Sequence, residues 1–203
     1  MMEKQEIEVK FHVLDLKRIE EILLENQAVV IQPRVHELNL RFDTPNEDLS
    51  KEHRVLRLRR DQNVLLTYKG PSLFREGARV RTEVQTVVAD FEATKTILEE
   101  LGYQVVLRYE KYRAEYEWHD THISLDEMPY GNFVEVEGDD PQQIHAVSDW
   151  IGLRWQTRIP LSYVEIFHKI CSKEAISERD LLFEVFKERR INLVDYGISP
   201  ADG

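Results

Sequence analysis

Apolar and polar residues alternate strictly over residues 5–13, which predicts a β-strand with one apolar and one polar face. The same alternation predicts further strands over residues 37–43, 54–60, 64–69, 78–88, 105–118, 121–127 and 133–137. Short polar turns such as Asp61-Gln62-Asn63 separate several of these segments. We therefore expect about eight strands, most of them consecutive and so antiparallel.

Apolar residues at helical spacing predict helices over residues 15–26 and 90–101, the first with Asp15 as its N-cap and the second ending at Gly102. Three more helices are expected over residues 141–153, 160–170 and 177–190. The last residues, 192–203, are rich in glycine and proline and are expected to be loose. We therefore expect one domain over residues 1–172, followed over residues 173–203 by a C-terminal helix and a loose tail.

The polar faces of the strands carry a high density of charge of both signs, whereas solvated faces usually mix Thr, Ser, Lys, Glu and Gln. The acids at these positions are Glu6, Glu8, Glu83, Asp126, Glu135 and Glu137. The bases are Lys10, Arg57, Arg59, Lys69, Arg79, Arg81, Lys111 and Arg113. Strands with one charged and one apolar face can close into a barrel with the charges inside and helices outside. The fold class expected is therefore α+β, an eight-stranded antiparallel closed β-barrel, or tunnel.

The whole chain is acidic, since its 203 residues include 27 Lys and Arg against 38 Asp and Glu, a net charge of −11. This balance argues against a nucleic-acid polymer as partner. No apolar run approaches the roughly 20 residues that span a membrane, and residues 1–10 lack the apolar core of a signal peptide. The one cysteine, Cys171, excludes an internal disulfide framework. A cytoplasmic protein without a membrane partner, either a monomer or a homodimer, is expected.

The expected lumen differs from the whole chain, because its bases outnumber its acids by two. Arginine and lysine neutralise phosphate oxygens, and carboxylates hold Mg²⁺ or Mn²⁺. Carboxylates two residues apart on a strand point the same way about 7 Å apart, as Glu6 with Glu8 and Glu135 with Glu137 would. The parity of His12, His122 and Ser124 also allows them a place at the tunnel ends. A small polyanion bound together with a divalent cation fits this composition.

The ordered set of motifs resembles the CYTH superfamily, or triphosphate tunnel metalloenzymes, over about residues 5 to 170. The hallmark Glu-x-Glu-x-Lys is present as Glu6-Ile7-Glu8-Val9-Lys10. The later motifs follow in order as Phe42-Asp43-Thr44-Pro45, Arg57-Leu58-Arg59, Tyr68-Lys69-Gly70-Pro71, Arg81-Thr82-Glu83, Glu110-Lys111-Tyr112-Arg113, Leu125-Asp126-Glu127, Phe133-Val134-Glu135-Val136-Glu137 and Ser162-Tyr163. The resemblance implies an eight-stranded tunnel, so that residues 1–172 would form a CYTH-like tunnel domain.

The resemblance also implies roles for the charged residues. The metal ligands would be Glu6, Glu8, Glu135 and Glu137, with Asp126 and Glu83 assisting or holding a second Mg²⁺ or Mn²⁺ ion. The triphosphate would be gripped by Lys10, Arg57, Arg59, Lys69, Arg81 and Arg113, together with Arg79 and Lys111. Catalysis would depend on Glu6, Glu8, Lys10, Glu83 and Asp126.

A metal-dependent triphosphatase that hydrolyses inorganic triphosphate or a nucleoside triphosphate is the leading hypothesis, because the acidic set is complete. The alternative is a class IV adenylyl cyclase, because residues 101–113 also resemble the corresponding region of those enzymes. Its members often carry a Gly-x-Gly loop where this chain has Pro129-Tyr130-Gly131-Asn132. A thiamine triphosphatase and a non-catalytic polyphosphate- or nucleotide-binding module are further alternatives.

Overall fold

A single antiparallel sheet organises the computed structural model, which describes residues 4–76 and 78–203. In this part of the chain the sheet has nine strands: β1 (Lys4–Val13), β2 (Val29–Asp43), β3 (Val55–Arg60), β4 (Val64–Lys69), β5 (Leu73–Arg75), β6 (Ala78–Val87), β7 (Gln104–Trp118), β8 (Thr121–Met128) and β9 (Gly131–Gly138).

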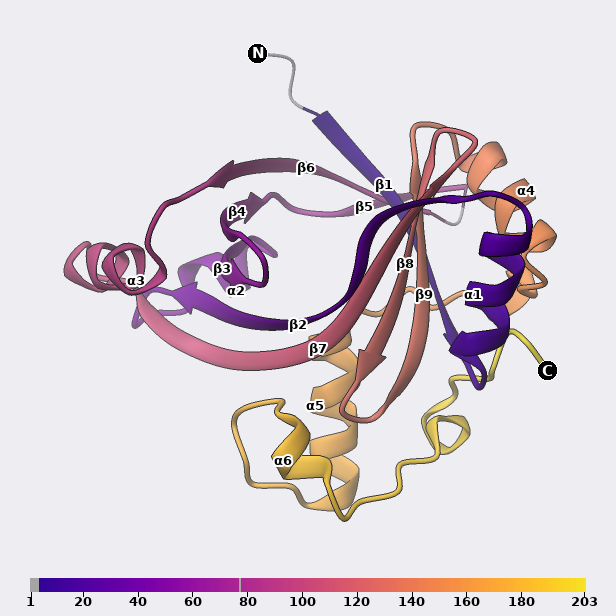
Figure 1. Ribbon diagram of the computed structural model, residues 1–203. Coiled ribbons are helices and arrows are strands. Elements are labelled where there is room, and N and C mark those ends of the chain that lie inside the picture. The colour runs from indigo at the N-terminus through magenta and orange to yellow at the C-terminus, as the bar shows by residue number, and fades with distance from the viewer. Residues whose placement is uncertain (1–3, 77) are drawn as a thin grey trace.

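The sheet closes on itself. Its order is β1-β9-β8-β7-β2-β3-β4-β6, and β1 also pairs with β6, so that these eight strands form a ring (Figure 1). The short β5 is an additional strand, paired only with β6. The ring of eight antiparallel strands expected from the alternation is confirmed. Closure leaves no open sheet edge between the strands of the ring.

β2 is longer than the alternation predicts, because it begins at Val29 and not at Glu37. Its first part pairs with β7, with register shifts between Val30 and Gln32 and between Gln32 and Val35. Pro33 lies within this stretch and has no backbone N–H for the ladder. The irregular pairing hides the period-two signal that identifies a strand from sequence.

The helices are α1 (Leu16–Glu25), α2 (Asp48–Lys51), α3 (Phe91–Glu100), α4 (Pro141–Trp150), α5 (Tyr163–Glu174) and α6 (Phe183–Phe186), with the 3₁₀ turns η1 (Trp155–Thr157) and η2 (Leu193–Tyr196). Asp15 caps α1 as expected, accepting a hydrogen bond from the Arg18 N–H. Within residues 4–76 and 78–203, no helix has both the length and the apolar character to span a membrane.

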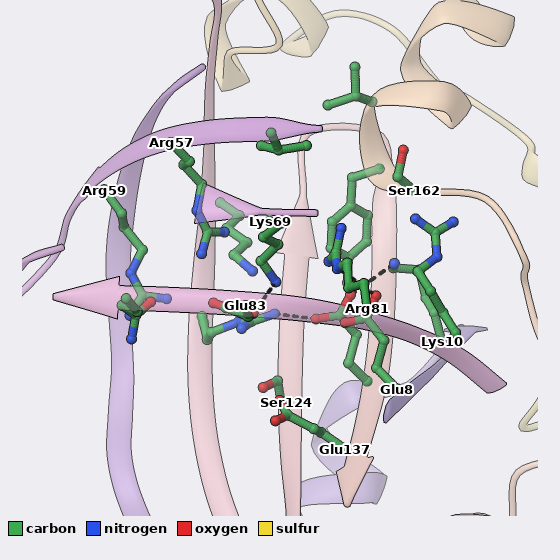
Figure 2. A pocket seen from close by; sticks show the side chains of 18 of the residues that line it. Glu8, Lys10, Arg57, Arg59, Lys69, Arg81, Glu83, Ser124, Glu137 and Ser162 are labelled. Carbon is green, nitrogen blue, oxygen red and sulfur yellow. Dashed lines mark hydrogen bonds and ion pairs between the residues drawn. The ribbon is translucent and has the colours of Figure 1, made fainter. Parts of the chain in front are cut away.

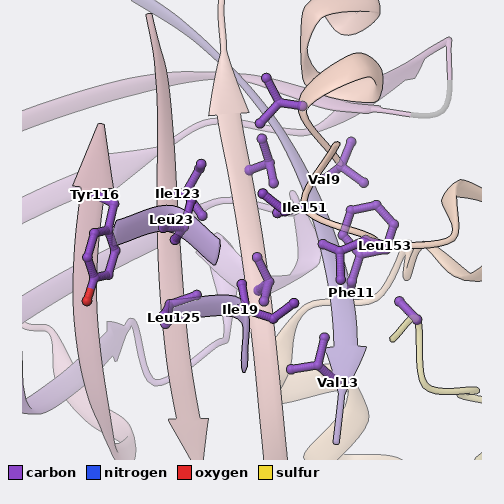
Figure 3. Close-up of a cluster of buried hydrophobic side chains, with 14 of the residues drawn as sticks. Val9, Phe11, Val13, Ile19, Leu23, Tyr116, Ile123, Leu125, Ile151 and Leu153 are labelled. Carbon is purple, nitrogen blue, oxygen red and sulfur yellow. The ribbon is translucent and has the colours of Figure 1, made fainter. Parts of the chain in front are cut away.

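The main apolar core lies on the outside of the ring, because each strand turns its apolar face away from the lumen. Val9, Phe11 and Val13 of β1 pack against Ile19 and Leu23 of α1 (Figure 3). Each such buried side chain contributes about 1.5–3 kcal/mol of hydrophobic stabilisation. The charged face of β1 is thereby directed into the lumen.

The prediction of a helix over residues 177–190 is wrong, since only the four residues of α6 are helical there. Leu181 instead forms a parallel bridge with Tyr109 of β7, donating to the Arg108 carbonyl and accepting from the Glu110 N–H. β8 pairs with β7 only from Tyr112 onward, so the first part of β7 has backbone groups to spare on that side. Those hydrogen bonds outweigh the local preference for a helix.

The tail expected to be loose is also packed against the ring. The Ala201 N–H donates to the His12 carbonyl, and the Asp202 carboxylate accepts from the backbone N–H groups of Leu14 and Asp15. Ala201 itself is 1% exposed. Residues 173–203 are therefore integrated with the tunnel rather than appended to it.

Candidate functional site

The inside of the ring encloses a cavity of about 660 Å³. All eight of the predicted phosphate-gripping bases line it, as several do visibly in Figure 2: Lys10, Arg57, Arg59, Lys69, Arg79, Arg81, Lys111 and Arg113. The carboxylates that line it are Glu8, Glu83, Glu115, Glu135 and Glu137. Period-two alternation places them together, because every second residue of a closed sheet faces the lumen.

Ion pairs hold the lining side chains in place. Lys69 Nζ lies 2.8 Å from Glu83 Oε2, and Arg81 Nη2 lies 3.5 Å from Glu8 Oε1. These side chains are 11–19% exposed, so the pairs are shielded from solvent more than surface ion pairs are. These ion pairs order the charged side chains of the cavity.

Glu135 is enclosed by cations. Its Oε1 lies 2.9 Å from Lys10 Nζ, and its Oε2 accepts a 2.5 Å hydrogen bond from Arg113 Nη2. Burial alone would raise the pKa of Glu135, but the charges of Lys10 and Arg113 hold it well below its ordinary value. This carboxylate is therefore ionised and already paired.

Asp126 is not among the residues that line the described cavity, although it lies on the same face of β8 as the lining residues His122 and Ser124. It is fully buried and bonded to three residues that do line the cavity. It accepts hydrogen bonds from Lys111 Nζ at 3.0 Å, Arg113 Nε at 2.7 Å and the Tyr163 hydroxyl at 2.7 Å. Both carboxylate oxygens are engaged by these donors. In this arrangement Asp126 positions Lys111 and Arg113, and its lone pairs are not open to a metal ion.

Glu37 also contacts cations of the tunnel, and it was not among the site residues expected from the sequence. It is fully buried, with Arg59 Nη1 at 3.3 Å and Lys111 Nζ at 3.7 Å. Burial would raise the pKa of Glu37, but Lys111, Arg113 and Arg59 together lower it to about 2. The signal was present, because Glu37 has the opposite parity to the apolar Leu38 and Leu40.

Arg41 and Tyr109 are two further lining residues that sequence reasoning missed. Arg41 shares the parity of Glu37 on β2, and Tyr109 shares that of Lys111 on β7. The Tyr109 hydroxyl lies 3.5 Å from Arg57 Nη1. Burial would raise the pKa of Tyr109, but the charge of Arg57 and its hydrogen bond lower it overall. Nine cations and five carboxylates therefore line the described cavity, an excess of four positive charges.

Only some of the residues with possible places at the tunnel ends line the cavity. His122 and Ser124 line the cavity, and so do Ser162 and Tyr163 at the start of α5. His12 is absent from the described lining and packs against Phe133, with its Nδ1 2.9 Å from the Asn132 carbonyl oxygen.

The donor set suits a hard divalent cation in part. Glu8 and Glu137 are register partners on β1 and β9, and both line the cavity. Carboxylate oxygens are the ligands that Mg²⁺ and Mn²⁺ prefer. Among the side chains that the structure describes, no group of three or more from His, Cys, Asp or Glu is arranged around a common point. The side chain of Glu6 lies outside the described residues, and its role stays a prediction.

Comparison with known proteins agrees with this geometry. The model of the CYTH domain matches residues 4–149. No protein of curated description matches the sequence.

Solved structures share the fold. A Vibrio parahaemolyticus protein, provisionally assigned as an adenylate cyclase, is 23% identical with a TM-score of 0.73, covering 81% of this chain and 98% of its own. A Pyrococcus horikoshii OT3 protein is 26% identical with a TM-score of 0.68 over the same shares of the two chains. A Hippeastrum protein, first assigned as an adenylyl cyclase and described as having a dominant triphosphatase activity, is 17% identical with a TM-score of 0.59, covering 81% of this chain and 95% of its own.

Proposed function

This chain belongs to the CYTH domain family, and on that premise we propose that it is a divalent-metal-dependent triphosphatase. Its substrate would be inorganic triphosphate or a nucleoside triphosphate held inside the tunnel. The observation that carries the proposal is the excess of four positive charges around an enclosed cavity that also holds the carboxylate pair Glu8 and Glu137. The Hippeastrum protein of the same fold supports the same class of reaction.

Binding would rest on the chain's own cations. Phosphoryl transfer requires neutralisation of phosphate charge and accurate positioning more than covalent catalysis. Arginine guanidinium groups bind phosphate oxygens bidentately, and the lysine ammonium groups act as point charges. Since Lys111 and Arg113 are held by hydrogen bonds to Asp126, these cations would meet the substrate with little further ordering.

The metal would be held by Glu8 and Glu137, with Glu6 joining them by the resemblance to the family. A bound Mg²⁺ or Mn²⁺ ion would supply further neutralisation of the charge that develops on the phosphate oxygens. Glu135 is unsuited to the same task in its present contacts, because Lys10 and Arg113 already occupy it.

Glu83 is the lining carboxylate that we assign to the attacking water. It is anchored by Lys69 at 2.8 Å, so its position is set before the substrate arrives. Glu83 would accept a hydrogen bond from the water and orient it toward the terminal phosphorus. Attack would break the bond between that phosphorus and its bridging oxygen, releasing orthophosphate and the shortened phosphate chain.

The alternative is cyclisation of ATP to cyclic AMP and pyrophosphate, which the provisional assignment of the Vibrio protein brings forward. The two reactions share the tunnel and differ in the nucleophile. A single assay separates them: phosphate release from inorganic triphosphate, ATP and thiamine triphosphate is measured with Mg²⁺ or Mn²⁺, and cyclic AMP is measured in parallel. Release from inorganic triphosphate or ATP without cyclic AMP supports the proposal. Cyclic AMP from ATP, release from thiamine triphosphate alone, or no product would contradict it.

The carboxylate pair is tested by Glu8→Gln and Glu137→Gln. Each substitution keeps the size of the side chain and removes its charge, so metal-dependent turnover should fall on the order of a hundredfold. The midpoint of thermal unfolding should be unchanged or raised. Glu25→Gln removes the same charge from the exposed end of α1 and should be neutral. Full activity in both tunnel variants would refute the metal assignment.

A further inference from the structure

Arg41 is a cavity cation without a partner of its own. Its side chain lines the tunnel from β2, and within the described chain it takes part in neither a hydrogen bond nor an ion pair. The nearest acid on the same face of β2 is Asp43, whose carboxylate accepts hydrogen bonds from the backbone N–H groups of Leu49 and Ser50. The charge of Arg41 is thus available to something inside the cavity.

Arg57 lies directly opposite Arg41 on the neighbouring strand, since the two are register partners. Burial lowers the pKa of Arg41, Tyr109 and Asp43 offset part of this effect, and the positive charges of Arg57 and Arg81 lower the pKa further. Like charges on directly opposed residues of a sheet are destabilising. A polyanion placed between the two guanidinium groups would remove that repulsion.

The buried amide of Asn39, on the same strand as Arg41, also lacks a partner among the described residues. Asn39 is fully buried and is the register partner of both Arg59 and Tyr109. Neither atom of its amide has a hydrogen-bond partner in the part of the chain that the structure describes. An unpaired buried amide costs about 1–3 kcal/mol, so the neighbourhood of Tyr109 is prepared for a further polar molecule.

Arg41, Arg57 and Tyr109 lie at one end of the cavity. Tyr109 and Glu115 both line it from β7, and six residues of strand span about 20 Å. Glu115 pairs in register with Ser124, the neighbour of Glu135, so it marks the end with the carboxylates. At the other end the charge of Arg41 reaches His168 of α5.

We propose that Arg41, Arg57 and Tyr109 form a subsite for the terminal phosphate group of the substrate, the one furthest from Glu8 and Glu137. The assignment rests on the proposed function and adds Arg41 and Tyr109 to the residues that contact the phosphate chain. The two guanidinium groups bind the terminal oxygens from adjacent strands, and the Tyr109 hydroxyl donates a hydrogen bond to one of them.

The test is calorimetric titration of inorganic triphosphate into the full chain with EDTA, so that no metal contributes. Arg41→Gln should weaken binding on the order of tenfold to a hundredfold, the usual effect of losing a hydrogen bond to a charged group. Arg41→Lys should lie between this variant and the unchanged protein, and Tyr109→Phe should weaken binding less. Arg18→Gln, an exposed position on α1, removes the same charge and should bind as the unchanged protein does.

Two further readouts separate ligand contact from a structural role. Without ligand, Arg41→Gln should keep or raise the thermal midpoint, because the repulsion with Arg57 is relieved. In ³¹P NMR spectra of bound triphosphate, Arg41→Gln should shift one terminal resonance and leave the central one in place. Equal affinity of Arg41→Gln and Arg18→Gln, or a shift confined to the central phosphorus, would overturn the subsite alone. Absence of triphosphate binding to the unchanged protein would overturn the proposed function as well.

Discussion

Glu37 stabilises the tunnel through its charge, although it does not line the cavity. Its pKa of about 2 lies below the ordinary value of 4.5, because Lys111, Arg113 and Arg59 outweigh the effect of burial. A carboxyl group with a lowered pKa stabilises the folded state above its ordinary pKa, and this contribution is lost as the pH falls toward 2. The difference corresponds to about 3 kcal/mol.

Glu37→Gln should therefore lower the free energy of unfolding by about 3 kcal/mol at pH 7. Its stability should also fall less steeply than that of the unchanged protein between pH 5 and pH 3. Urea unfolding at a series of pH values measures both quantities. Glu25→Gln serves as the control for the change in net charge. Parallel pH profiles for Glu37→Gln and the unchanged protein would contradict the assigned role.

For a single residue, the sequence predicts which face of its strand the side chain occupies but not which residues it contacts. Alternation placed all eight expected bases in the cavity, because parity in a closed sheet decides which face a side chain occupies. Alternation could not reveal that the Asp126 carboxylate would accept hydrogen bonds from Lys111, Arg113 and Tyr163. That outcome depends on α5, which brings Tyr163 across from a distant part of the chain.

Among the elements, the segment after α5 departs furthest from the sequence pattern. Leu182, Phe183, Val185 and Phe186 have spacing compatible with a helix, and a helix was expected. The structure uses the preceding Leu181 as an extra strand residue along β7. Leu181 and Tyr109 are 72 residues apart in the sequence, so their pairing cannot be detected in a local window. By contrast, α1 and α3 depend on local caps and apolar spacing, and both were predicted correctly.

Leu181→Ala tests whether this segment supports the tunnel. Leu181 is fully buried in the cluster that also contains Tyr109 and Tyr163, so its truncation leaves a cavity behind the lining of the tunnel. The expected loss of stability is about 2–5 kcal/mol by chemical denaturation. Val194→Ala, at a side chain 53% exposed in η2, should have little effect. A neutral Leu181→Ala would show that the packing of Leu181 against β7 does not support the tunnel.

Considered as a whole, the molecule carries a net charge of −11 around an interior with four excess positive charges. At low ionic strength the Debye length reaches about 30 Å, and an approaching triphosphate meets the overall negative charge before the interior. Added salt screens this repulsion first, while the enclosed cations are shielded from it.

The association rate constant for inorganic triphosphate should consequently rise several-fold between about 10 and 150 mM salt. Stopped-flow measurements in EDTA, with a fluorescence change of the protein as signal, would record it. A rate constant that falls with salt would indicate that a positive mouth steers the ligand and that the net charge of the exterior has no part in its capture.

The closure of the ring also affects how the chain can be made. β1 precedes every other described strand, yet it pairs with β6 and with β9. Its His12 carbonyl accepts a hydrogen bond from the Ala201 N–H, and the N–H of Leu14, just after the strand, donates to the Asp202 carboxylate. A ribosome therefore synthesises β1 long before its partner strands β6 and β9 exist. During that interval the strand exposes an apolar face and an unpaired backbone, the kind of segment that aggregates or is bound by chaperones. Translation thus delivers the hallmark residues of the tunnel early, and the fold can enclose them only late.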